Sequence, residues 1–134
     1  MGRWQEIDHT ADLALHLWAD DLRDLFVTAA RGMFSLIVAL DTIQPERATA
    51  IALEAPDVEI LLVDWLNELL YLAEVEGVAF TFFEFEHLSA TELQATVRGG
   101  PITDYLSYVK AATFHNLAVA RTLEGYETEI VFDT

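Results

Sequence analysis

The segment Asp8-His9-Thr10-Ala11-Asp12 places two carboxylates and an imidazole within five residues, between two short apolar runs. Two aspartates this close repel each other by about 4 kcal/mol at ~4 Å and an effective dielectric constant of ~20. A bound cation, a helix N-terminus or solvation must offset that repulsion. Two interpretations stay open: a solvated turn in which Asp8 or Thr10 hydrogen-bonds to the backbone, and a metal site with oxygen ligands.

A second pair of anionic groups lies at the end of the sequence, where an apolar run stops at Asp133 and Thr134. Chain ends usually fray. A well-packed strand that ends at an aspartate and a terminal carboxylate therefore suggests that both groups are used. Hard oxygen ligands suit Ca²⁺ or Mg²⁺ better than a soft metal, so we treat Asp133 and Thr134 as candidate ligands.

Other polar residues occur within stretches whose pattern favours regular structure. Alternation predicts a strand over residues 109–120, and it would place Lys110 and His115 on opposite faces, where they cannot act as one acid/base pair. Asp64 and Glu68 share one face of an expected helix with Asn67 and Tyr71. That face is either solvated or an edge that contacts a partner or faces a metal, and Lys110, Asp64 and Glu68 are the candidate partner contacts.

Hydrophobic periodicity predicts the elements that position these groups. Apolar residues recur at helical spacing over residues 21–38, with Asp20 as N-cap, and over residues 57–74, with Pro56 at the first helical position and Gly77 closing the helix. We expect Gly99-Gly100-Pro101 to form a turn and residues 102–108 a short helix or loop. The expected strands are residues 3–7, 13–18, 48–55, 78–86, 92–98, 109–120 and 126–132.

These elements indicate an α+β fold in which a largely antiparallel or mixed β-sheet packs against the two main helices. The 134 residues suffice for a single domain, residues 1–134, with a real core. Hydrophobic residues make up 53% of the chain, which excludes a disordered protein. No cysteine is present, so the chain has no disulfide, thiolate zinc site or cysteine nucleophile. Without a visible signal peptide or membrane-spanning run, we expect a soluble cytoplasmic protein.

The charge balance restricts the partners. The chain has 23 acidic and 7 basic residues, a formal net charge of −16. Such a surface repels phosphate backbones, so direct binding to RNA or DNA is not expected. It attracts cations and steers the protein toward a basic partner.

Five segments together resemble the archease family. They are His9-Thr10-Ala11-Asp12, the helix that includes Asp24-Leu25-Phe26, the long stretch from Leu61 to Tyr71, the stretch from Val109 to His115, and the terminal Val131-Phe132-Asp133. Their order and spacing cover essentially the whole chain. No single segment is decisive, but the set is highly specific.

The resemblance implies a single α+β domain that is a protein cofactor and not an enzyme. The client of archeases is the GTP-dependent tRNA-splicing ligase of the RtcB family, whose guanylylation and repeated turnover they promote. The family's metal site, usually associated with Ca²⁺, falls on Asp12, Asp133 and Thr134. The family usually has a small aliphatic residue where this chain has Thr134, which changes little if main-chain oxygens are the ligands. Asp8 and His9 are additional candidates at the site.

Two other functions remain open at the level of sequence. One is a small metal-dependent hydrolase in which Asp12 and Asp133 hold the ion and His9 acts as base. Few acid/base groups and no recognisable nucleophile constellation accompany them. The other is a chaperone-like module whose acidic surface shields basic RNA- or DNA-modifying enzymes.

Overall fold

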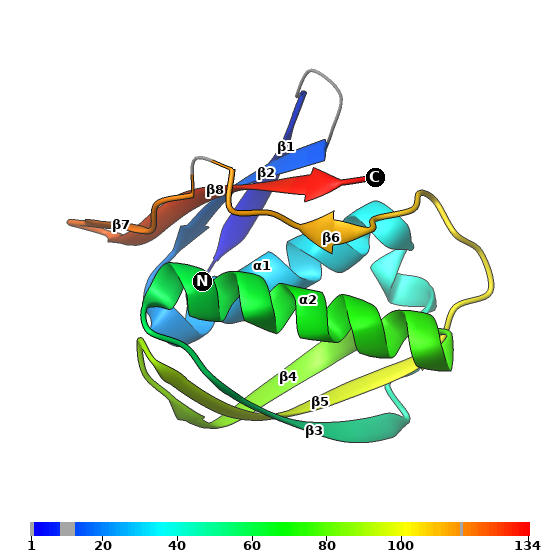
Figure 1. The fold of residues 1–134 in the computed structure, drawn as a ribbon. Coiled ribbons are helices and arrows are strands. Elements are labelled where there is room, and N and C mark those ends of the chain that lie inside the picture. Colours follow the sequence, from blue (N-terminus) through cyan, green and yellow to red (C-terminus); the bar gives the residue numbers. More distant parts are fainter. Residues whose placement is uncertain (1, 9–12, 116) are drawn as a thin grey trace.

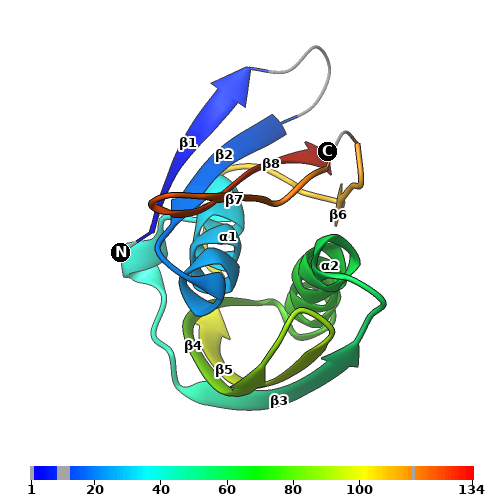
Figure 2. The same ribbon diagram turned by 90° about the vertical axis from the view of Figure 1, so that its left-hand side faces the viewer.

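The protein is a three-layer structure in which the helices lie between two β-sheets (Figures 1 and 2). The computed structural model describes residues 2–8, 13–115 and 117–134, with only the backbone of Asp8. Within these residues the chain forms two α-helices and two antiparallel sheets. The predicted α+β fold with two main helices is confirmed. The strands divide between two sheets, because the helix pair has an apolar face on each side and each face packs against a sheet.

The first sheet has the strand order β1-β2-β8-β6, and β7 also pairs with β8. Every pairing in it is antiparallel. Leu15 and Leu17 of β2 are fully buried against the helices, as the alternation predicts. The strands are β1 (Arg3–Asp8), β2 (Leu13–Ala19), β6 (Ala111–Ala112), β7 (Ala120–Thr122) and β8 (Gly125–Asp133).

The second sheet has the strand order β3-β5-β4, with β3 (Arg47–Glu54), β4 (Val78–Leu88) and β5 (Glu92–Pro101). A short 3-10 helix, η1 (Leu40–Thr42), precedes β3. The turn predicted at Gly99-Gly100-Pro101 is wrong, because all three residues lie in β5. The glycines serve close backbone approach: a Cβ at Gly99 would lie 2.4 Å from the Ala79 carbonyl oxygen, and one at Gly100 2.0 Å from that of Gln44.

Helix α1 (Leu22–Ile37) begins one residue later than the predicted start at residue 21. Asp21, not Asp20, is the N-cap, and its side chain accepts a hydrogen bond from the Asp24 N–H at 2.7 Å. Gly32 is a point of close packing, since an added Cβ would lie 3.0 Å from the Leu15 side chain.

Helix α2 (Val58–Glu76) confirms the helix predicted over residues 57–74. Asp57 is its N-cap and accepts from the Ile60 N–H at 2.8 Å, so the prediction of Pro56 as the first helical residue is wrong. Gly77 ends the helix in the left-handed conformation (φ 68°), as predicted. Neither described helix combines the length and the apolar run needed to span a membrane.

The single strand predicted over residues 109–120 is wrong. Ala112 pairs with Phe132 and Ala120 pairs with Glu127, so eight steps along this segment face only five along β8. The surplus residues cannot stay in the ladder, and the described residues between β6 and β7 lie outside the strands. The ambiguous residues 102–108 form a loop without helix or strand.

Candidate functional site

The C-terminal end of β8 brings one predicted ligand to the same end of the sheet as the Asp8–Asp12 connection. Leu13, which follows this connection directly, is the register partner of Phe132, and Asp133 comes next along β8. His9 and Asp12 lie outside the described residues, as does the side chain of Asp8. The pairing of Asp12 with Asp133 therefore stays a prediction. It is based on the register that pairs their chain neighbours Leu13 and Phe132.

Asp133 and Thr134 are both exposed, so their oxygens face solvent. The main-chain oxygen of Asp133 accepts a hydrogen bond from the Lys110 N–H at 2.8 Å. Its carboxylate makes no hydrogen bond or ion pair with another described residue. Exposed, hard oxygen donors of this kind suit Ca²⁺ or Mg²⁺. No three histidine, aspartate or glutamate side chains cluster within the described part of the chain, and the metal site stays a prediction.

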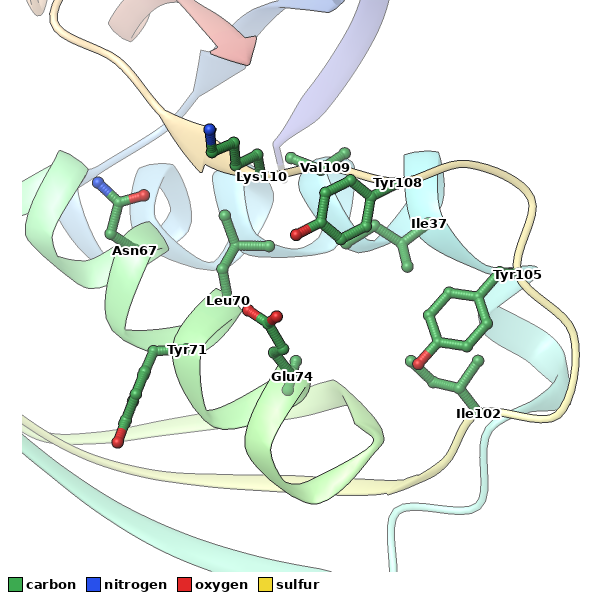
Figure 3. A pocket seen from close by; sticks show the side chains of 11 residues that line it. Ile37, Asn67, Leu70, Tyr71, Glu74, Ile102, Tyr105, Tyr108, Val109 and Lys110 are labelled. Atoms are coloured by element: carbon green, nitrogen blue, oxygen red, sulfur yellow. The ribbon is translucent and has the colours of Figure 1, made fainter. Parts of the chain in front are cut away.

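Lys110 and His115 are both exposed and lie outside strands. Because they do not lie in a strand, alternation does not place their side chains on opposite faces. The backbone of Lys110 links the 102–110 loop to β8, and its ammonium group points away from Glu74 in Figure 3. A partner contact by Lys110 stays a prediction.

Asn67 has a structural role that its predicted helix face did not reveal. Its Oδ1 accepts from the Ala112 N–H at 2.8 Å, and its Nδ2 donates to the Ala112 carbonyl at 3.1 Å. This pair of bonds imitates a neighbouring strand and holds β6 against α2. Asp64 and Glu68 on the same helix are partly exposed, and their partner role stays a prediction.

Replacing Asn67 by alanine should lower the free energy of unfolding by about 1–3 kcal/mol, because it leaves both backbone groups of buried Ala112 without partners. Urea denaturation of the purified protein measures this loss. Glu68→Gln is the matched control on the same helix and should stay within about 0.5 kcal/mol of the wild type. Equal losses for the two variants would contradict the role given to Asn67.

A cavity of about 320 Å³ lies between the C-terminal half of α2 and the 102–110 loop (Figure 3). The residues around it include Tyr105, Tyr108 and Glu74. Both tyrosines belong to residues 102–108, for which the sequence predicts either a short helix or a loop. Their spacing carried no periodic signal that could have identified the cavity. The remaining lining residues are Ile37, Asn67, Leu70, Tyr71, Ala73, Ile102, Val109 and Lys110.

The fold defines a small acidic α+β protein with two helices between antiparallel sheets. Its surface has two features suited to binding, which are the exposed oxygens of Asp133 and Thr134 and the cavity beside α2. A model of the Archease protein family (MTH1598/TM1083) matches residues 4–134. The chain therefore belongs to the archease family. It is 39% identical to the archease of Methanopyrus kandleri, over 97% of this chain and 98% of the relative. It is 37% identical to that of Archaeoglobus fulgidus, over 98% of each chain.

Solved structures share the fold over nearly the whole chain. The solution structure of protein 1598 of Methanobacterium thermoautotrophicum has a TM-score of 0.74 and 26% identity, with 98% of both chains covered. The crystal structure of an archease from Thermotoga maritima, described as a possible chaperone, has a TM-score of 0.70 and 23% identity. This match covers 97% of the present chain and 96% of the Thermotoga maritima chain.

Proposed function

We propose that this protein is a non-enzymatic activator of a GTP-dependent tRNA-splicing ligase of the RtcB family. In this role it promotes guanylylation of the ligase and multiple turnover in tRNA splicing and RNA repair. The observation that carries the proposal is the archease match over residues 4–134, because the family resemblance implies this client. We place the protein in the cytoplasm, with its partner.

The charge of the chain supports a protein partner over direct RNA binding. A formal net charge of −16 opposes contact with phosphates and favours docking at a basic cleft. The acidic end of β8 would dock near the nucleotide-binding cleft of the ligase and favour the geometry that attacks GTP. A tight complex with tRNA alone that survives ~200 mM salt would count against this arrangement.

The proposal includes a divalent cation, most suitably Ca²⁺, held by Asp12, Asp133 and Thr134. Support comes from the exposed carboxylate of Asp133, which has no partner among the described residues, and from the register that sets Leu13 beside Phe132. Asp12 precedes Leu13 in the sequence, and Asp133 follows Phe132. Each candidate ligand is therefore the direct chain neighbour of one member of this pair. Asp8 and His9 belong to the same connection and are additional candidates. A bound cation would lower the mutual repulsion of these carboxylates.

Calcium should stabilise the folded protein by about 2.7 kcal/mol when present at about 100 times its dissociation constant, because the unfolded chain has no assembled site. Thermal unfolding with CaCl2 and with NaCl of equal ionic strength measures the specific part of this gain. Asp133→Asn should lose it. Glu84→Gln removes an exposed carboxylate from β4 and should keep it. Equal stabilisation of both variants would show that Ca²⁺ acts only on net charge.

Transfer of labelled guanylate from GTP to the cognate ligase tests the activation step. We expect the protein to raise the rate of label incorporation without becoming labelled itself. An unchanged rate with a ligase that is active by itself would contradict the proposed step. Hydrolysis of a phosphate ester by the protein alone would instead favour the hydrolase alternative.

A chaperone-like module for basic enzymes is the second candidate, because the Thermotoga maritima archease is described as a possible chaperone. Its sequence identity of 23% supports a shared fold. The acidic surface of this chain fits such a role equally well. Stimulation or solubilisation of unrelated basic enzymes would favour the module, whereas strict dependence on the ligase would exclude it.

A further inference from the structure

The cavity beside α2 has an apolar floor and two aromatic walls. Leu70, Ile102 and Val109 contribute to the floor. Tyr105 and Tyr108 keep 60% and 58% of their surface exposed. In Figure 3 the Glu74 side chain rises from α2 with its carboxylate on the side of the Tyr108 hydroxyl, and both residues line the cavity. Exposed aromatic rings gathered around a cavity typically mark a binding site.

The loop that bears both tyrosines is fixed at three points, although it has no regular structure. The N–H groups of Ile102, Leu106 and Lys110 donate to the carbonyls of Gly77, Ile37 and Asp133, at 3.0, 2.7 and 2.8 Å respectively. These bonds tie the loop to α2, α1 and β8. The cavity is therefore largely preformed, which lowers the entropy cost of filling it.

The electrostatics of the cavity favour a cation. Glu74 and Glu76 lie in the last turn of α2, and that turn contains no basic residue. A helix C-terminus carries partial negative charge and is normally matched by lysine or arginine. Here the charge of the side chains adds to that of the helix end. The ammonium group of Lys110 points away from Glu74 (Figure 3), and Glu74 has no ion pair with another residue that the structure describes.

We propose that this cavity receives an arginine side chain of the protein partner. The guanidinium group would stack on Tyr105 or Tyr108 and pair with Glu74, while its aliphatic stem covers the apolar floor. The inference rests on the proposed function in that it names a contact by which the ligase is held. The backbone bond from Lys110 to Asp133 joins the cavity to the acidic end of β8, so both features fit one docking face. A nucleobase could stack on the same rings, but Glu74 would repel its phosphates.

Titration followed by NMR tests the site without any ligase. The probes are the capped peptides Gly-Arg-Gly and Gly-citrulline-Gly, which differ by the charge of one side chain of nearly equal shape. We expect the arginine peptide to shift the backbone amide signals of Tyr105, Tyr108 and Glu74. The citrulline peptide should bind at least about fivefold more weakly, because it lacks the cation. Equal binding of both peptides, or shifts elsewhere on the surface, would overturn the inference.

Two variants with the same change in net charge separate the cavity from the general acidity of the protein. Glu74→Gln should weaken the arginine peptide by at least about fivefold. Glu76→Gln lies on the same helical turn but not in the cavity lining, and it should bind the peptide as the wild type does. Equal weakening by both variants would overturn the inference. Displacement of the arginine peptide by oligouridylate would also overturn it, in favour of RNA.

Binding of the same two variants to the cognate ligase then distinguishes the inference from the proposed function. We expect Glu74→Gln to raise the dissociation constant at least fivefold relative to Glu76→Gln, with the fold unchanged by circular dichroism. Wild-type affinity of Glu74→Gln for a ligase that is still activated would overturn the arginine contact and leave the proposed function standing. Specific arginine binding without any ligase activation would overturn the proposed function and leave the cavity as an arginine site.

Discussion

Trp65→Ala should lower the free energy of unfolding by about 3–5 kcal/mol, the largest stability effect that we expect for a single substitution in this chain. Trp65 is fully buried at the centre of α2. Its ring lies 5.2 Å from that of Phe85 and 5.9 Å from that of Phe83, between centroids. Its Nε1–H donates to the Phe26 carbonyl at 3.1 Å. Alanine removes these aromatic contacts and this hydrogen bond, and it opens a cavity.

Chemical denaturation monitored by circular dichroism measures this effect. Val75→Ala is the matched control, because Val75 lies on the same helix with 65% of its surface exposed. It should change the stability by no more than about 0.5 kcal/mol. A loss below about 1 kcal/mol for Trp65→Ala would contradict the placement of this ring at the junction of α2 with α1 and the second sheet.

Asp12→Asn and Asp133→Asn should each reduce ligase stimulation to the rate of the ligase alone. Asparagine keeps the shape of the side chain but removes the negative charge that a divalent cation requires. Initial rates of RNA ligation with each variant measure the effect. Circular dichroism should show an unchanged fold, because Asp133 is exposed and its carboxylate bonds to no other described residue.

Glu84→Gln provides the control for this pair, since Glu84 is an exposed carboxylate on β4 of the other sheet. It removes one negative charge, as the site variants do, and should stimulate the ligase fully. Wild-type stimulation by Asp12→Asn and Asp133→Asn would remove the site assignment. Equal loss in all three variants would mean that net charge, and not a particular site, controls the encounter.

The fold could be predicted largely because local pattern and tertiary structure agree over most of the chain. The apolar stripe of α1 and the nearly all-round apolar girth of α2 indicate helices covered on more than one side, and the structure places them between two sheets. Gly77 predicts the end of α2 because glycine readily adopts the left-handed conformation, and it has that conformation in the structure. The start of α1 is displaced by one residue, from a predicted cap at Asp20 to Asp21, and that of α2 by two, from Pro56 to Val58, because neighbouring aspartates or a proline offer similar local signals.

The errors lie where tertiary contacts override local pattern. Gly99 and Gly100 have the composition of a turn, but their small size serves the close approach of Ala79 and Gln44. The alternation of residues 109–120 suits a strand, but β8 pairs with only the ends of that segment. Helical spacing places Asn67 on a polar helix face, whereas its two bonds to Ala112 take the place of a neighbouring strand.

The candidate site divides in the same way. Asp133 and Thr134 stand out in sequence because an apolar strand ends at them, and the register of β2 with β8 brings Leu13 beside Phe132. Only the family resemblance joins Asp12 to Asp133, since nothing in local spacing relates residues so far apart. The cavity of Tyr105 and Tyr108 could not be predicted, because three backbone bonds to separate elements shape its loop.

Ligation of a broken RNA under multiple-turnover conditions shows whether the protein activates the ligase. The reaction contains the cognate ligase, GTP and Mn²⁺, with or without a substoichiometric amount of this protein. If the protein activates the ligase, product should rise from a single turnover per ligase molecule to many, and one molecule of the protein should serve several ligase molecules. Product that stays at a single turnover with a demonstrably active ligase would contradict the proposed function and favour the chaperone-like module.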